Sequence, residues 1–291
     1  MATETPVAGR INQARLGGRR SAGPRAWLET ARRNLSVGRL NTCRRGNFET
    51  PDSYPPSPEG VTLYVIGDIH GRADCLLRAH ARIDSDRRSA QGASTATEIY
   101  LGDYVDRGPN SKAVLELMAA RVRERRVVAL RGNHETAMES FLAGRLPFAA
   151  WRRIGGAETL LSYGFSTLDL RRAEGPHREE FAERLPEDHR RFVASLSAFH
   201  QAGDYVFVHA GLRPSVALEN QEIDDFTGIR AAFLKHEGDF GFIVVHGHTP
   251  VERADFRPNR INLDTGAFIT NRLSVLHIDA TGAALLALET Q

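Results

Sequence analysis

Five polar clusters of the sequence, each containing glycine, hold residues that could bind metals or transfer protons. The clusters read GDIHG at 67–71, GDYVDRG at 102–108, GNHE at 132–135, HAG at 209–211 and HGHTP at 246–250. They supply aspartate, asparagine and histidine side chains, namely Asp68, Asp103, Asp106, Asn133, His70, His134, His209, His246 and His248. Oxygen and imidazole ligands without thiolate suit manganese, iron or zinc. The clusters therefore predict a metal site.

These candidate ligands are too many for one closed metal site. Two cations about 3.5–4 Å apart, bridged by one carboxylate, would use them more completely. A lone Gly-Asp pair is usually a turn, and a lone histidine usually has a structural role. We assign that role to the histidines outside the clusters, which are His80, His177, His189, His200, His236 and His277. Turn chemistry does not explain ligand types at five equivalent positions, so we predict a two-metal centre.

Short apolar runs precede the clusters and are expected to position them. The runs, predicted as strands, are Val61–Ile66, Glu98–Leu101, Val127–Leu130, Tyr205–Val208 and Phe242–Val245. Helices are predicted at Ala73–Ile83, Ser111–Arg123, His134–Leu142 and Arg178–Phe199. Two later strands, Ser274–Ile278 and Ala284–Leu288, are predicted to form a hairpin. The alternation predicts an α/β domain, with the clusters beyond the carboxyl ends of its strands, where open α/β sheets bind ligands.

Composition fits an ordinary globular enzyme. The chain has 291 residues, 41% of them hydrophobic and 25% charged, and a net charge of +2. Cys43 and Cys75 cannot form a disulfide framework. No apolar run is long enough to span a bilayer, and the N-terminus has no apolar segment typical of a secretory signal. We therefore expect no membrane span and a cytoplasmic location.

Residues 1–57 differ from the rest of the chain. They hold 10 arginines, no lysine and 4 acidic residues, and they end in a proline-rich stretch. We predict a disordered tail, with a short helix possible at Ala26–Asn34, followed by a folded domain over 58–291. An arginine-rich arm for nucleic acid or anionic lipid, or a transit peptide, are the alternatives. The scarcity of aromatic residues for base stacking disfavours nucleic acid.

In order and spacing, the clusters resemble the phosphoprotein phosphatase branch of the calcineurin-like metallophosphoesterases. That pattern is GDxHG, GDxxDRG, GNHE, HxG and GH, and it covers about 58–291 of this chain. The stretch from Trp151 to Gly164, and Gly228 to Leu234, are similar to the small bacterial members. The resemblance implies an α/β fold in which two mixed β-sheets pack face to face and are flanked by helices, as a four-layer α/β/β/α sandwich.

The resemblance also implies roles for single residues. Asp68 and His70 would hold the first metal, Asp103 would bridge both, and Asn133, His209 and His248 would hold the second. A hydroxide between the metals would attack phosphorus. Asp106 would orient His134 and favour its protonated form, and His134 would protonate the leaving oxygen. Arg107 and Arg230 would bind the phosphoryl oxygens. The two divalent ions are expected to be manganese, with iron or zinc as alternatives.

One position departs from the pattern of the broader superfamily, in which a second histidine often follows two places after the first. This chain has Pro250 there, so His248 is assigned as the ligand. His246 is expected to be a strand-end residue that supports the site from outside the ligand set.

The expected function is phosphomonoester hydrolysis, with a serine/threonine protein phosphatase as the first reading. Its partner would be a phosphorylated protein or a small phosphoester. A dinucleoside polyphosphate hydrolase, of the diadenosine tetraphosphate type, is the alternative because it uses the same ligands. A phosphodiesterase fits GDxxDRG less well. A non-catalytic scaffold is the distant alternative, and it would purify without metal and without activity.

Overall fold

Two five-stranded mixed β-sheets form the centre of the fold. The computed structural model describes residues 54–89, 95–171 and 176–288. The first sheet has the order β10-β9-β1-β2-β3, with the bounds β1 Val61–Ile66, β2 Thr95–Tyr100, β3 Val127–Ala129, β9 Val275–Asp279 and β10 Gly282–Leu285. The second has the order β4-β5-β6-β8-β7, with the bounds β4 Phe199–Ala202, β5 Tyr205–Val208, β6 Ile243–His246, β7 Asp255–Arg257 and β8 Arg260–Asn262. Strands β1, β2 and β3 are parallel to one another, and so are β5, β6 and β8.

The sheets pack against each other through alternate residues of their strands. In β1, Leu63 and Val65 join the core between the sheets, whereas Tyr64 and Ile66 join the core beneath the helices. In β5, residues Tyr205 and Phe207 face the first sheet, and the residues between them face outward. This period of two, with both faces apolar, explains why these strands are continuous apolar runs in the sequence.

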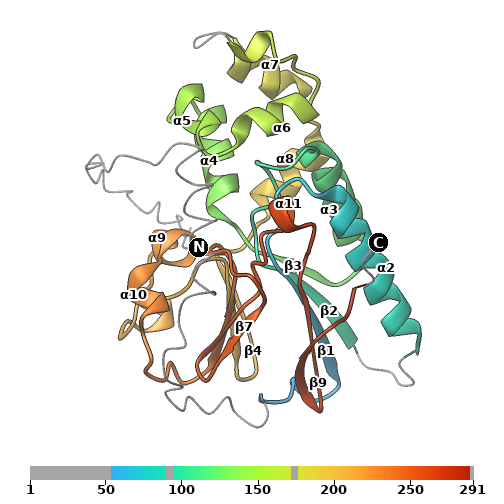
Figure 1. Cartoon of the computed structure of the whole chain (residues 1–291), viewed down its shortest axis with the longest axis vertical. Helices are drawn as coiled ribbons and strands as arrows, with labels where there is room; N and C mark the ends of the chain where they lie inside the picture. Colours follow the sequence, from blue (N-terminus) through green and yellow to red (C-terminus); the bar gives the residue numbers. More distant parts are fainter. Residues whose placement is uncertain (1–53, 90–94, 172–175, 289–291) are drawn as a thin grey trace, which may run out of the picture.

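Helices cover the outer face of each sheet (Figure 1). Those over the first sheet are α2 Ala73–Ser89, α3 Ser111–Glu124, α4 Asn133–Leu142, α5 Phe148–Arg152, α6 Gly156–Ser162, α7 His177–Arg184 and α8 Glu187–Ala194. The second sheet carries α9 Ile223–Gly228 and α10 Ala231–Leu234. Short 3₁₀ turns occupy Asp169–Arg171 and Leu218–Asn220, and α11 spans Ala267–Thr270. The predicted four-layer α/β/β/α fold is confirmed.

One predicted helix is wrong. The segment Arg178–Phe199 forms α7, α8 and the first residue of β4 rather than a single helix. Pro186 has no N–H to donate within a helix and restricts the residue before it, so α7 ends at Arg184 and Pro186 caps the start of α8. Helix α2 continues to Ser89, six residues beyond its predicted end, and the ion pair between Arg82 and Asp86 lies in that extension.

The first described residues pack on the second sheet. Tyr54 is 8% exposed, its hydroxyl donates to the carbonyl of Arg257 at 3.1 Å, and its ring meets Phe256 edge-on. The hydroxyl of Tyr205 donates to the carbonyl of Pro55 at 2.6 Å. Chain segments on both sides of the predicted boundary at residue 57 therefore contact the domain. The helix expected at 26–34 lies outside the described residues.

A buried ion cluster joins α2, β2 and α3. Glu98 is fully buried and accepts hydrogen bonds from Arg121 Nε and Nη2, both at 2.8 Å. Arg121 also donates to both oxygens of Asp84 at 2.8 and 2.9 Å. The cluster fixes the helices that support the first sheet. Across the described ranges, no helix has the length and hydropathy needed to cross a membrane.

Candidate metal centre

The predicted ligands lie together where the carboxyl ends of parallel strands from both sheets meet. Contacts between the two sheets fix this arrangement. The N–H of Gly247 donates to the carbonyl of His209 at 2.8 Å, and the N–H of His248 donates to Asp68 Oδ2 at 3.0 Å. His209 Nδ1 donates to the carbonyl of Leu101 at 2.9 Å. Residues that are up to 180 positions apart in the chain thus share one site.

Four candidate ligand atoms surround one point of the site. His209 Nε2 lies 3.2 Å from Asn133 Oδ1, 3.2 Å from His248 Nδ1 and 3.4 Å from Asp103 Oδ1. Ligand atoms about 2.0–2.2 Å from a single ion lie roughly 3.0–3.6 Å from one another. Because Nδ1 of His209 donates to a carbonyl, its Nε2 keeps a lone pair for a cation. These four side chains fit one transition-metal ion.

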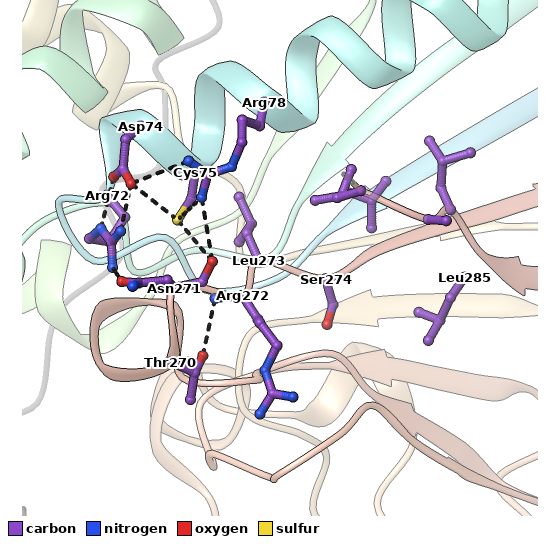
Figure 2. Close-up of a pocket in the computed structure, with 14 residues that line it drawn as sticks. Arg72, Asp74, Cys75, Arg78, Thr270, Asn271, Arg272, Leu273, Ser274 and Leu285 are labelled. Carbon is purple, nitrogen blue, oxygen red and sulfur yellow. Dashed lines mark hydrogen bonds and ion pairs between the residues drawn. The ribbon is translucent and has the colours of Figure 1, made fainter. Parts of the chain in front are cut away.

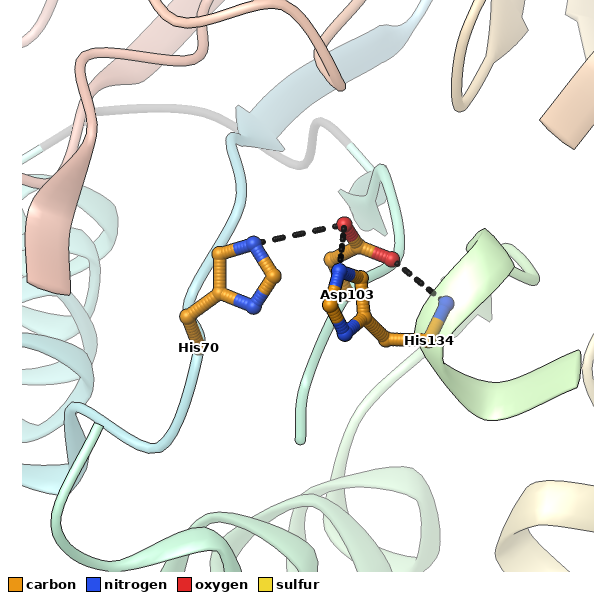
Figure 3. Close-up of side chains that lie close together, drawn as sticks. All are labelled: His70, Asp103 and His134. Carbon is orange, nitrogen blue, oxygen red and sulfur yellow. Dashed lines mark hydrogen bonds and ion pairs between the residues drawn. The ribbon is translucent and has the colours of Figure 1, made fainter. Parts of the chain in front are cut away.

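The other carboxylate oxygen of Asp103, Oδ2, faces a second group of candidate ligands, which contains His70 and His134 (Figure 3). His70 Nε2 lies 3.3 Å from Asp103 Oδ2, and His134 Nε2 lies 3.9 Å from it. His70 Nδ1 donates to the carbonyl of Val105 at 3.0 Å, which again leaves Nε2 for a cation. Asp68 Oδ1 is buried and has no hydrogen-bond partner. A second ion among these groups would satisfy that oxygen.

The backbone is strained at the site. Five of the seven non-glycine residues with positive φ in the described ranges are candidate site residues, namely His70, Asp103, Asp106, Arg107 and His248. Their φ values lie between 46° and 71°, and each such residue costs about 1–3 kcal/mol. Gly132 and Gly247 have no room for a Cβ, which would collide with Asp103 and Asp68 respectively. The glycines of the clusters thus let carboxylates lie directly on the backbone.

Asp106 and His134 form a fully buried pair. His134 Nδ1 donates to Asp106 Oδ2 at 2.7 Å. Trp151 Nε1 donates to the same oxygen at 2.9 Å, and Thr159 Oγ1 donates to the other at 2.7 Å. His134 Nε2 is buried without a hydrogen-bond partner. The pair can therefore hold or release a proton at Nε2, with Nδ1 fixed by the carboxylate.

The two predicted phosphate-binding arginines flank the ligands. Arg107 Nη1 donates to His70 Nε2 at 2.7 Å, and its guanidinium lies 5.3 Å from the ring centroid of Phe268 in α11. Arg230 Nη1 donates to Thr249 Oγ1 at 3.3 Å. Arg230 is the residue before α10, with a φ of −134°. Since it precedes the helix, its side chain is free of helical packing and reaches Thr249 beside His248.

Burial and charge set the protonation of the site. Burial raises the pKa of the Asp103 carboxyl, but the charges of His209, His134 and His70 outweigh it and hold this pKa well below its usual range. Burial lowers the pKa values of His70 and His248 well below normal, which favours the neutral imidazole that metals bind. Burial opposes protonation of His209, yet the Asp103 charge raises its pKa to about 9. A cation would compete with that proton.

Two buried acids of the site were not given roles by the sequence. Glu135 accepts hydrogen bonds from the N–H groups of Asp103, Tyr104 and Gly132 at 2.7–3.1 Å, so it shapes the loop that carries Asp103. Asp264 follows β8 and is 1% exposed. Burial raises the pKa of Asp264 to about 6, although the hydrogen bond from the Gly266 N–H and the charge of Arg107 lower it. Its strand has one apolar residue among three, which is too weak a signal for a sequence pattern.

The histidines that were assigned neither as ligands nor as the proton donor lie outside the two ligand groups. His246 is the last residue of β6, fully buried, with its ring centroid 4.9 Å from that of Phe233 in an edge-to-face contact. His80 Nε2 lies 2.8 Å from the hydroxyl of Tyr100. The other histidines outside the clusters also belong to neither group.

A separate pocket of about 790 Å³ lies behind α11 (Figure 2). Arg72, two residues after His70, lines it and donates to Asp74 at 2.8 Å and to the carbonyl of Ala267 at 2.8 Å. Arg72 also donates to Asn271. These bonds tie the loop after β1 to α11, so the pocket wall supports the site without containing its ligands.

Comparisons with known proteins agree with this geometry. The chain is 26% identical to the asymmetrical bis(5'-nucleosyl)-tetraphosphatase PrpE of Anoxybacillus flavithermus over 230 residues, which are 73% of this chain and 88% of that protein. It is 24% identical to the PrpE of Halalkalibacterium halodurans over 232 residues, with the same coverage.

Solved structures share the fold at lower identity. A candidate diadenosine tetraphosphatase has a TM-score of 0.53 and 18% identity, over 82% of this chain and 98% of that one. A cold-active protein tyrosine phosphatase from Shewanella has a TM-score of 0.51 and 16% identity, over 81% and 82%. The profile of calcineurin-like phosphoesterases matches residues 61–275, the span that holds all five clusters. The chain belongs to the calcineurin-like phosphoesterases, a family of metal-dependent phosphoester hydrolases with a dinuclear centre.

Proposed function

We propose that the chain is a two-metal hydrolase that cleaves dinucleoside polyphosphates. The position of Asp103 is the observation that supports two ions, because its Oδ1 lies with one ligand group and its Oδ2 with the other. In this proposal Asp68 and His70 hold the first ion. Asn133, His209 and His248 hold the second, and Asp103 bridges them. Manganese is the proposed metal, with iron or zinc as alternatives.

The protein side chains bind and protonate the substrate. When bound, two divalent ions polarise phosphoryl oxygens and lower the pKa of a water. Arg107 and Arg230 bind the non-bridging oxygens, for which a planar guanidinium is well shaped. His134 donates a proton from Nε2 to the leaving oxygen, while Asp106 keeps Nδ1 protonated and the ring in place. The free buried Nε2 of His134 supports this role.

The choice of substrate rests on the relatives. Proteins named for dinucleoside tetraphosphate hydrolysis match most of their own length to this chain, so the alternative of the sequence analysis now leads. The two PrpE relatives described above do not specifically support a serine/threonine protein phosphatase, which was the first reading. We keep the cytoplasm as the proposed location, supported by the buried free thiol of Cys75.

A substrate panel tests the proposal. Purified full-length protein with added manganese is assayed on diadenosine tetraphosphate, phosphoserine and phosphotyrosine peptides, and a cyclic nucleotide, with Asp103→Asn as the inactive control. We expect the highest kcat/KM on diadenosine tetraphosphate, by at least about tenfold, which corresponds to about 1.4 kcal/mol of transition-state discrimination. A phosphopeptide hydrolysed faster than the dinucleotide would overturn the substrate, and equal activity in Asp103→Asn would overturn the site.

A further inference from the structure

A sixth strand ends at the metal centre, and it brings a further carboxylate there. Strand β8 is parallel to β6, with His246 opposite Asn262, so the residues after both strands emerge at one edge. The N–H of Leu263 donates to the carbonyl of His246 at 2.8 Å. A Cβ on Gly67 would lie only 2.5 Å from the carbonyl oxygen of Leu263. The residue after Leu263 is therefore packed between the segments that carry Asp68 and His248.

That residue is Asp264, and half of its carboxylate has no partner in the protein. Oδ1 accepts the N–H of Gly266 at 2.9 Å, which is a local turn interaction. Oδ2 is buried and has no hydrogen-bond partner. A buried, unpaired carboxylate oxygen costs several kcal/mol unless something satisfies it. The turn accounts for one oxygen, and the second requires a ligand.

The surroundings of Asp264 indicate what that ligand is. Its negative charge acts on Asp68, on Arg107 and on Arg230. Like Asp68, Asp264 belongs to neither group of closely spaced ligand atoms, but unlike Asp68 it lies outside the five clusters that supply the assigned ligands, so we place it beside the ligand set rather than in it. A carboxylate just outside a ligand set commonly accepts a hydrogen bond from a ligand or a water on the ion.

We propose that Asp264 is a positioning residue of the metal centre, whose buried Oδ2 would accept a hydrogen bond from a water molecule or a ligand of a bound ion. This inference rests on the proposed two-metal function. It adds one negative charge beside Asp68 and Asp103, which would strengthen the binding of a divalent cation. It also accounts for an acid in the sequence NLDTG that none of the five clusters contains.

Manganese binding to the full-length protein tests the inference without an activity assay. The variant Asp264→Asn keeps an oxygen for the Gly266 N–H but removes the charge. Asp255→Asn, in the neighbouring strand β7, is the matched control. Isothermal titration calorimetry would measure the dissociation constants of both ions, and thermal unfolding without metal would show that each variant is folded. We expect one of the two constants to rise about 10- to 100-fold in Asp264→Asn and neither to change in the control.

The outcomes separate this inference from the proposed function. If the wild type binds two ions and folded Asp264→Asn binds them with unchanged dissociation constants, the role of Asp264 alone is overturned. A wild type that binds no manganese, iron or zinc would overturn the proposed function and this inference together. If Asp264→Asn does not fold, Asp264→Ser replaces it, because a serine hydroxyl can also accept the turn N–H, and the same constants decide.

Discussion

Replacing Asp106 by asparagine separates proton donation from metal binding. Asp106 accepts hydrogen bonds from His134, Trp151 and Thr159, and all of these can be kept by asparagine if its oxygen faces His134 and Trp151. Its amide nitrogen then faces the hydroxyl of Thr159, which can also accept. The geometry is preserved, and the negative charge opposite the His134 imidazolium is lost.

The size of the effect follows from that one charge. A hydrogen bond to a charged group contributes about 1.5–3 kcal/mol. Asparagine keeps a neutral hydrogen bond of about 0.5–1.5 kcal/mol, so the loss is about 1–1.5 kcal/mol. At about 1.36 kcal/mol for each factor of ten, this loss slows proton donation by about 5- to 12-fold. The loss applies only to a leaving group that needs the proton. The fully buried pair has no water to replace the lost charge.

Two aryl or alkyl phosphates with different leaving groups make the assay independent of the physiological substrate. A para-nitrophenolate leaves without protonation, whereas the alkoxide of a phosphoserine peptide requires it. We expect kcat/KM of Asp106→Asn to fall about 5- to 12-fold more on the phosphoserine peptide than on para-nitrophenyl phosphate. Metal content should stay at two ions. Asp84→Asn, which breaks an ion pair with Arg121 away from the site, is the control.

Equal losses on the two substrates would refute the reasoning, because they would show that His134 does not protonate the leaving oxygen. Loss of a metal ion from Asp106→Asn would also refute the reasoning, because it would show that Asp106 and His134 contribute to metal binding rather than to proton donation. In that case His134 would be better described as a metal ligand, in the group that also contains His70 and Asp103.

Four further predictions follow from other parts of the molecule. Asp103→Asn should lose at least one metal ion, measured by elemental analysis, because its two oxygens face two ligand groups; two retained ions would contradict the bridge. Chelation of the metals should lower the melting temperature of the wild type, since a ligand that binds only the folded state at 100 times its Kd stabilises it by about 2.7 kcal/mol; an unchanged melting temperature would speak against a bound ion. A chain beginning at Ser53 should keep the melting temperature of the full chain, whereas one that also lacks Tyr54 should lose about 3–5 kcal/mol, because that ring is buried; equal stability of the two would show that the ring contributes little. Arg121→Met should lose up to about 3–5 kcal/mol in denaturant unfolding, since it leaves the buried carboxylate of Glu98 with only Arg87 and the hydroxyl of Tyr100 as partners, while the exposed pair broken in Arg123→Met should cost under about 1 kcal/mol; similar losses in both would contradict the burial argument.

Local patterns predicted the elements that carry strong local signals. Strands β1 and β5 have their predicted bounds because both faces of each are largely buried, which makes nearly every residue apolar, with Thr62 as the exception. The hairpin of β9 and β10 is also present. Gly132 and Gly247, which follow β3 and β6, mark places where backbone and carboxylate come close, and that requirement is visible in sequence.

What the sequence could not predict depends on distant packing. Strand β8 has three residues, Arg260–Asn262, and only its pairing with β6 and β7 makes it a strand, so Asp264 was missed. Trp151 and Thr159 lie 45 and 53 residues from the carboxylate they bond. Charge on buried groups is likewise set by three-dimensional neighbours, as at His209, whose pKa rises beside Asp103.

The strained backbone has a consequence for how this protein can evolve. Arg107 has a φ of 68°, which glycine adopts without penalty. Arg107→Gly would relax the loop by about 1 kcal/mol while removing a guanidinium that faces the ligands. A laboratory population selected only for heat resistance would therefore accumulate changes at such positions and lose turnover. In relatives of unknown substrate, a stability screen would favour replacing non-glycine residues with positive φ. The positions it selects would mark the functional centre.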